Sequence, residues 1–347
     1  MRVLFLTLYP EAAASPRYRV HQFLPHLEAA GIACDVRAPL SEAEWRRHSG
    51  PSRQGRAFWY HALETPRRIR QILLARRYDA VFLQKAITTA YLPGLDRVLR
   101  AGARRLIYDI DDAVHLAPPH PLRMPWSLLE DRNQARRLMA CADRVLAGNR
   151  WLADEAAALG GNATCFPTVV DTDRFTPGPA PTAFRAGWMG APATAPALDT
   201  IGEALDELAP GELLVAGADP AQVHWEAART VPWRYDTEVE IVQQFSVGLM
   251  PLARDAWTRG KCALKALTYM AAGVPCIATP YGAITDIIRH GENGWFAETP
   301  AEWRAALAAL RDPALRNRLG EAARATAEAD FSLSVAAPRL ARLLEEA

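Results

Sequence analysis

Several features that mark common functional classes are missing from this chain of 347 residues. Its five cysteines are scattered without a C-x-x-C pair, which argues for a reducing compartment and against a structural zinc site. No apolar run approaches the roughly 18–20 residues of a membrane-spanning helix. The first apolar run, at residues 3–8, is too short for a signal sequence and predicts a buried strand. A net charge of only +1 gives no overall attraction to nucleic acid.

Short catalytic motifs are absent as well. The sequence contains no G-x-G-x-x-G fingerprint, no H-E-x-x-H metal motif and no G-x-S-x-G nucleophile elbow. The pair Gly260-Lys261 does not complete a Walker A motif, because Asp255 replaces its first glycine and Cys262 its Ser/Thr. We therefore expect no resident cofactor and no bound metal.

The patterns that are present predict an α/β protein. Half of the residues are hydrophobic and 23% are charged, which is the balance of a globular chain. Short apolar runs alternate with helical patterns, and the alternation restarts near residue 185 after a proline-bearing stretch. Such alternation favours parallel sheets with helices on both faces. We expect two doubly wound, Rossmann-like domains facing across a cleft, at residues 1–168 and 169–330, followed by a terminal helix at 331–347.

Residues 259–275 are the most informative stretch. They predict a short helix that Gly273 and Pro275 end. Lys261, Lys265 and Thr268 are spaced i, i+4, i+7 and would share one face of that helix. Two ammonium groups beside a helix N-terminus favour an anion such as a phosphate or diphosphate. The alternative is a solvated lysine face on an amphipathic helix.

This stretch and the residues after it resemble the donor site of family 4 glycosyltransferases, enzymes of the GT-B fold. The resemblance rests on a small-residue-Gly-x-Pro turn at residues 271–275 and on a Gly-x-Asn-Gly turn at 291–294 followed by Trp295. Residues 166–177 also resemble the interdomain stretch of that family. The resemblance implies a second domain that binds the nucleotide sugar, no required metal, and a terminal helix that packs back on the first domain.

The departures from the family pattern bear on the donor site. The two glutamates that the family carries on the donor helix would fall at Gly260 and Thr268, and neither residue is acidic. The family's basic pair after the first strand of the second domain is also missing from the loop at Gly190. We therefore expect Lys261 and Lys265 to hold the diphosphate beside Gly190. Thr268 would replace the ribose-binding glutamate only weakly.

The first domain should supply the acceptor side. Arg17 and Arg19 follow the first predicted strand, and their planar guanidinium groups suit a phosphate or carboxylate. An arginine pair facing solvent at a helix start is the alternative. Asp111, Asp112 and His115 follow another apolar strand and would lie at its carboxyl end, where active sites gather.

We assign those three residues to contacts with the donor sugar or the acceptor hydroxyl. The bland alternative is that Asp109 or Asp112 only caps the next segment. Asp-x-Asp also resembles the metal motif of the GT-A glycosyltransferase fold. We discount that reading because the other matches point to GT-B.

The resemblance implies a retaining glycosyltransferase of the hexosyltransferase type. It would move a sugar from a nucleotide-diphosphate sugar to a hydroxyl of a glycan, a lipid-linked sugar or a small metabolite. A non-catalytic binding subunit and a GT-B epimerase or phosphorylase are the alternatives. We expect a cytoplasmic protein that acts on cell-envelope glycans. The arginine-rich helix at residues 65–77 is compatible with contact to the inner membrane face, or is simply a solvated surface helix.

Overall fold

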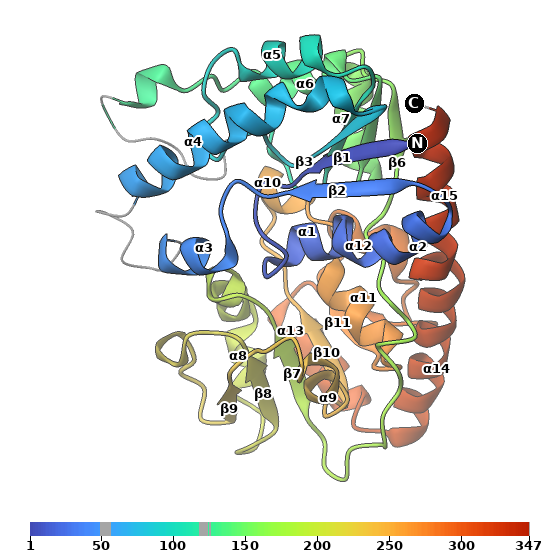
Figure 1. Cartoon of the computed structure of the whole chain (residues 1–347). Coiled ribbons are helices and arrows are strands. Elements are labelled where there is room, and N and C mark those ends of the chain that lie inside the picture. The colour runs from blue at the N-terminus through green and yellow to red at the C-terminus, as the bar shows by residue number, and fades with distance from the viewer. Residues whose placement is uncertain (49–56, 118–123, 125, 347) are drawn as a thin grey trace. The chain divides into compact units, whose positions relative to one another are not determined.

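The computed structural model describes residues 1–48, 57–117, 124 and 126–346 (Figure 1). The chain forms two compact units. The first consists of Met1–Thr168, Gly260–Cys262 and Ala336–Ala347, and the second of Val169–Arg259 and Ala263–Val335. Each unit is built on one six-stranded parallel sheet, so the predicted α/β class with two doubly wound sheets is confirmed.

The sheet of the first unit has the strand order β2-β1-β3-β4-β5-β6. Its strands are fully buried at its centre, because helices cover both faces, and they therefore consist almost wholly of apolar residues. The strand bounds are β1 Arg2–Leu6, β2 Ala33–Arg37, β3 Ala80–Gln84, β4 Leu106–Ile110, β5 Arg144–Ala147 and β6 Ala163–Cys165.

The helices of the first unit lie on opposite faces of the sheet because parallel crossovers are right-handed. The chain leaves β1 toward β2 and then returns past β1 to β3, so α1 and α2 lie on one face while α4 to α7 cover the other (Figure 1). The bounds are α1 Ala14–Arg19, η1 His21–Phe23, α2 Leu24–Ala29, α3 Glu42–His48, α4 Ala57–Leu73, η2 Ala75–Arg77, α5 Leu95–Gly102, η3 Trp126–Leu129, α6 Gln134–Cys141 and α7 Arg150–Ala158.

The sheet of the second unit has the order β12-β11-β10-β7-β8-β9. The strands are β7 Ala186–Met189, β8 Leu213–Ala216, β9 Ala228–Val231, β10 Val247–Met250, β11 Cys276–Ala278 and β12 Trp295–Phe296. The helices are η4 Pro192–Ile201, α8 Gly202–Leu205, η5 Pro220–Gln222, α9 Glu238–Val242, α10 Ala256–Arg259, α11 Leu264–Ala271, α12 Ile284–Ile287, α13 Pro300–Ala309 and α14 Pro313–Asp330. A last helix, α15 Leu333–Glu346, ends the described chain.

Each sheet has one point at which the order of its strands reverses. In the first unit it lies between β1 and β3, and in the second between β7 and β10. Ligands of open α/β sheets bind outside the carboxyl ends of the strands at such a point. We therefore expect site residues near the carboxyl ends of these two strand pairs.

Candidate functional site

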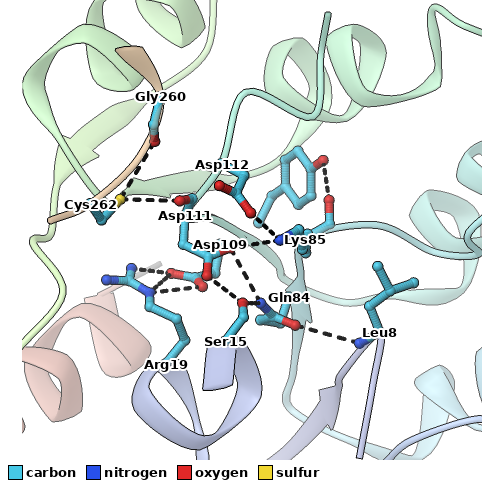
Figure 2. A network of polar contacts seen from close by, with 11 residues as sticks. Leu8, Ser15, Arg19, Gln84, Lys85, Asp109, Asp111, Asp112, Gly260 and Cys262 are labelled. Atoms are coloured by element: carbon cyan, nitrogen blue, oxygen red, sulfur yellow. Dashed lines mark hydrogen bonds and ion pairs between the residues drawn. The ribbon is translucent and has the colours of Figure 1, made fainter. Parts of the chain in front are cut away.

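Polar side chains of the first unit gather at the carboxyl ends of β3 and β4 and on the helix that follows β1 (Figure 2). Ser15 and Arg19 come from α1, Gln84 and Lys85 from the end of β3, and the aspartates from β4 and the residues after it. These segments are distant in sequence, but the parallel register brings them to one edge of the sheet.

Arg19 and Asp109 form a buried ion pair at the base of this group. The Nε of Arg19 donates to both carboxylate oxygens of Asp109 at 3.1 Å, and its Nη1 donates to the carbonyl of Phe166 at 2.8 Å. Burial would lower the pKa of Arg19, but the charge of Asp109 outweighs it, so the net pKa lies above its usual value. The phosphate or acceptor contact expected of Arg19 is replaced by a structural role, because both side chains are almost wholly buried.

Asp111 is held by neutral donors. Ser15 donates a hydrogen bond to its Oδ2, and the amide of Gln84 lies 3.5 Å from its Oδ1 and also donates to the Ser15 hydroxyl. The thiol of Cys262, from the short segment Gly260–Cys262 that belongs to this unit, lies 3.2 Å from the Asp111 carbonyl (Figure 2). With 11% of its side chain exposed, Asp111 serves mainly to tie these segments together.

Lys85 pairs with Asp112 directly and lies 3.8 Å from Asp111. Burial would lower the pKa of Lys85, but the charges of Asp112 and Asp111 outweigh it, so the pKa is raised and the ammonium stays charged. Its backbone is in the left-handed region, with φ of 72°, which is rare for a residue with a side chain. Such strain is typical of functional sites. Asp112 is 22% exposed, more than Asp111 or Lys85, so its carboxylate is the most accessible of the three.

Two other predicted residues of this unit are enclosed. The side chain of His115 is fully buried against Trp151, and its Nε2 lies 3.5 Å from Glu155. Burial lowers the pKa of His115, which keeps the ring neutral near pH 7. A substrate contact through His115 is therefore corrected to a packing role. Arg17 is 7% exposed and donates to the carbonyl of Ala12 at 2.7 Å. The phosphate contact expected of Arg17 stays a prediction.

The second unit brings Gly190 and Lys265 together at the carboxyl end of β7, beside the reversal of strand order. The ammonium of Lys265 lies 4.3 Å from the centroid of the Trp188 ring and donates to the Thr194 hydroxyl at 3.2 Å. A Cβ added to Gly190 would lie 2.6 Å from the Trp188 ring and 2.8 Å from Cε of Lys265. The predicted juxtaposition of these two residues is thus present, and only glycine fits between the lysine stem and the indole.

The predicted helix face is wrong in two places. α11 begins at Leu264, after Ala263 with φ of 54°, so Lys261 precedes the helix and belongs to the first unit. Lys261 is therefore not part of the helix that carries Lys265. Thr268 is only 2% exposed and its hydroxyl donates to the Lys265 carbonyl at 2.7 Å, so it is not free to bind a ribose.

The sequence offered a signal for Lys85 that motif reasoning missed. Only three of the 40 basic residues are lysines, and they are Lys85, Lys261 and Lys265. Lys85 directly follows a buried strand, which is the same position that drew attention to the aspartates after β4. No comparable sequence signal predicts the other residues of the two groups, because their roles depend on neighbours far away in the sequence. These residues are Ser15, Gln84, Trp188 and Thr194.

No cluster of three His, Cys, Asp or Glu side chains that could hold a metal ion is present within the described ranges.

Comparison with known proteins identifies the second half of the chain. Residues 183–312 match the family model of the group 1 glycosyl transferases. This part of the chain is similar to a group 1 glycosyltransferase domain. The predicted enzyme class, a glycosyltransferase, is therefore confirmed, and the matched domain contains Gly190, Lys265 and Thr268.

Solved structures similar to this chain share its fold. HepE from Anabaena, in complex with UDP and glucose, is 15% identical with a TM-score of 0.68, and the match covers 100% of both chains. Sucrose-phosphate synthase from Thermosynechococcus elongatus is also 15% identical with a TM-score of 0.68, over 99% of this chain and 98% of that one. The fold is that of the GT-B glycosyltransferases, as predicted.

A curated relative matches a shorter part of the chain. N-acetyl-alpha-D-glucosaminyl L-malate synthase of Bacillus anthracis is 38% identical over 68 residues, which are 19% of this chain. The match spans only 18% of that relative's length.

Proposed function

We propose that the protein is a retaining glycosyltransferase that moves a sugar from a nucleotide-diphosphate sugar to a hydroxyl acceptor. The observation that carries the proposal is the group of Gly190, Trp188 and Lys265 at the carboxyl end of β7, inside the group 1 domain. It provides a cation whose stem packs between the Trp188 ring and Gly190. The complexes of HepE with UDP and with UDP-glucose support a nucleotide sugar as the donor.

A glycosyl transfer of this kind is favoured by positive charge beside the leaving group. As the glycosidic bond of the donor breaks, negative charge develops on the nucleotide diphosphate. A cation that is already in place stabilises this charge more in the transition state than in the ground state. Lys265 would do so from the first turn of α11, beside the carboxyl end of β7. The N–H groups at the start of α11 and η4, where no side chain caps either helix, would add to its effect.

We assign the acceptor to the first unit. Asp112 is the most accessible carboxylate of the group at the ends of β3 and β4, and Lys85 fixes its orientation. A carboxylate held in this way would accept a hydrogen bond from the acceptor hydroxyl. The acceptor would be a glycan, a lipid-linked sugar or a small metabolite, and no metal would be needed.

The experiment that tests the donor site is thermal unfolding in the presence of UDP, GDP, dTDP, ADP and their sugars. A ligand at 100 times its dissociation constant stabilises the folded protein by about 2.7 kcal/mol, which gives a clear shift. One nucleotide class should shift the melt of the wild type. Folded protein that responds to none of them would contradict the proposal and would favour a non-catalytic subunit, since the family glutamates are replaced by Gly260 and Thr268.

We also propose that the protein is cytoplasmic and touches an anionic membrane through α4. None of the helices in the described ranges combines the length and apolarity needed to cross a bilayer. On α4, however, Trp59, Ile69 and Leu73 are 60%, 38% and 65% exposed at helical spacing. Arg70 on the same helix is exposed as well. An exposed apolar stripe beside arginine is the pattern of an interfacial helix.

Vesicle binding tests this contact. The wild type should sediment with vesicles that contain phosphatidylglycerol and much less with pure phosphatidylcholine. The double variant Trp59→Ser/Leu73→Ser should lose this binding. Val335→Ser is the matched control, because Val335 is 50% exposed on α15 in the second unit. Equal binding by both variants would contradict a role for α4.

A further inference from the structure

Trp188 occupies an unusual position for a tryptophan. It lies on the central strand β7 with no exposed surface, and its indole N–H finds no hydrogen-bond partner among the described residues. A buried N–H without a partner costs free energy that a leucine or phenylalanine would avoid. The indole should therefore provide something that a smaller apolar side chain lacks.

The indole of Trp188 provides a large aromatic face on which a cation can lie. The Lys265 ammonium lies 4.3 Å from the ring centroid, well inside the range of about 6 Å for a cation–π contact. Thr194 accepts a hydrogen bond from the same ammonium at 3.2 Å. The two partners belong to different elements, Trp188 to β7 and Thr194 to η4. Contacts on two sides restrict the position of the ammonium more than one contact would.

Gly190 is a third neighbour of the Lys265 side chain. Because a Cβ there would approach both the Trp188 ring and Cε of Lys265 within 2.8 Å, the lysine stem passes directly over the glycine. The stem is therefore packed between the indole and the backbone of the turn after β7. A lysine on an open helix face would instead sample many rotamers and lose them on binding.

We propose that Trp188 is a positioning residue that holds the Lys265 ammonium in place for the diphosphate of a nucleotide sugar, with Thr194 as its second support. The proposal rests on the proposed function for the identity of the anion. Trp188 would act through Lys265 and would not touch the donor itself. Its removal should therefore weaken binding only while Lys265 is present.

The first test needs no ligand. With only three lysines in the chain, protein labelled with ¹³C-lysine gives three sets of ε-methylene signals, and the variant Lys265→Arg assigns one of them. The ring current of Trp188 should shift the Lys265 signal upfield. The shift should disappear in Trp188→Leu and persist in part in Trp188→Phe. An unshifted Lys265 signal in the wild type would overturn the proposal.

The second test is a double-mutant cycle on the affinity for UDP and for uridine. In the wild-type background, Trp188→Leu should weaken UDP binding roughly two- to thirtyfold, the range of a cation–π contact, and leave uridine binding nearly unchanged. In the Lys265→Ala background the same substitution should have little effect on UDP. Equal losses in both backgrounds would overturn the proposal, since Trp188 would then act independently of Lys265.

Trp303→Leu is the matched control. Trp303 lies in the same core, is 1% exposed and also has an indole N–H without a partner among the described residues. Its loss should lower stability without coupling to Lys265. Wild-type protein that binds no nucleoside diphosphate would contradict the proposed function and the assignment of the anion, while the lysine signal would still decide whether Trp188 holds Lys265.

Discussion

The buried pair of Arg19 and Asp109 allows a sharp prediction about what holds the first unit together. Replacing Arg19 by methionine keeps most of the apolar stem but leaves the Asp109 carboxylate buried without its cation. Breaking a buried pair from one side costs about 3–5 kcal/mol. We expect a loss of that size in the free energy of opening of the first unit.

The double variant Arg19→Met/Asp109→Leu should recover much of this loss, because replacing both charges by apolar groups is often nearly neutral. The effect of Arg19→Met should also depend on pH. Burial raises the pKa of Asp109 to about 6 even though Arg19 opposes the shift. Without Arg19 the folded-state pKa should rise further above its unfolded value. The variant is then least destabilised at low pH, and its deficit grows as pH rises through that pKa.

Hydrogen exchange of the β4 amides, measured from pH 5 to pH 8, reports opening of the first unit alone. Arg46→Met is the control, because its pair with Glu42 is exposed, with 66% and 52% of the two side chains accessible. Exposed pairs contribute at most about 1 kcal/mol. A loss of less than about 1 kcal/mol in Arg19→Met, or a deficit that does not change with pH, would contradict a stabilising role for the buried pair.

Two further predictions concern glycines. Gly190→Ala should weaken nucleotide binding about tenfold or more, by analogy with the loss of a preorganised contact, because its Cβ would lie 2.6 Å from the Trp188 ring. Gly202→Ala is the control, because its Cβ would meet nothing closer than 3.6 Å. In calorimetry this control should bind UDP like the wild type. Gly260→Glu restores the first family glutamate, but it should lower the melting temperature and should not raise turnover. The reason is that a Cβ at residue 260 would lie 2.7 Å from the backbone nitrogen of Ala113. A variant with higher activity and unchanged stability would contradict this prediction.

The sheets could be predicted from the sequence because buried parallel strands read as uninterrupted apolar runs. The run at residues 80–84 coincides with β3, and the helix end at Gly273 fits its φ of 72°. The helix start was not predictable in the same way. Ala263 breaks the pattern with a left-handed backbone that alanine rarely adopts, and this removes Lys261 from α11.

The site was predictable only where a residue directly follows a strand. Asp111 and Asp112 were found by that rule, and Lys85 could have been. The partners that decide what each group does come from far away in the sequence, as Ser15 does for Asp111 across 96 positions. Arg19 shows the consequence, since its charge suggested a ligand contact and its buried partner Asp109 gives it a structural one.

In the proposed donor site, Lys265 at the carboxyl end of β7 holds the diphosphate of a nucleotide sugar. Calorimetric titration of wild type and Lys265→Ala with UDP and UDP-glucose, and with GDP, dTDP and ADP as comparators, tests it most directly. We expect the wild type to bind one class of nucleotide. Lys265→Ala, equally folded, should bind it at least tenfold more weakly and with a smaller dependence on salt. Equal affinity in the two proteins would contradict a role for Lys265 in holding the diphosphate.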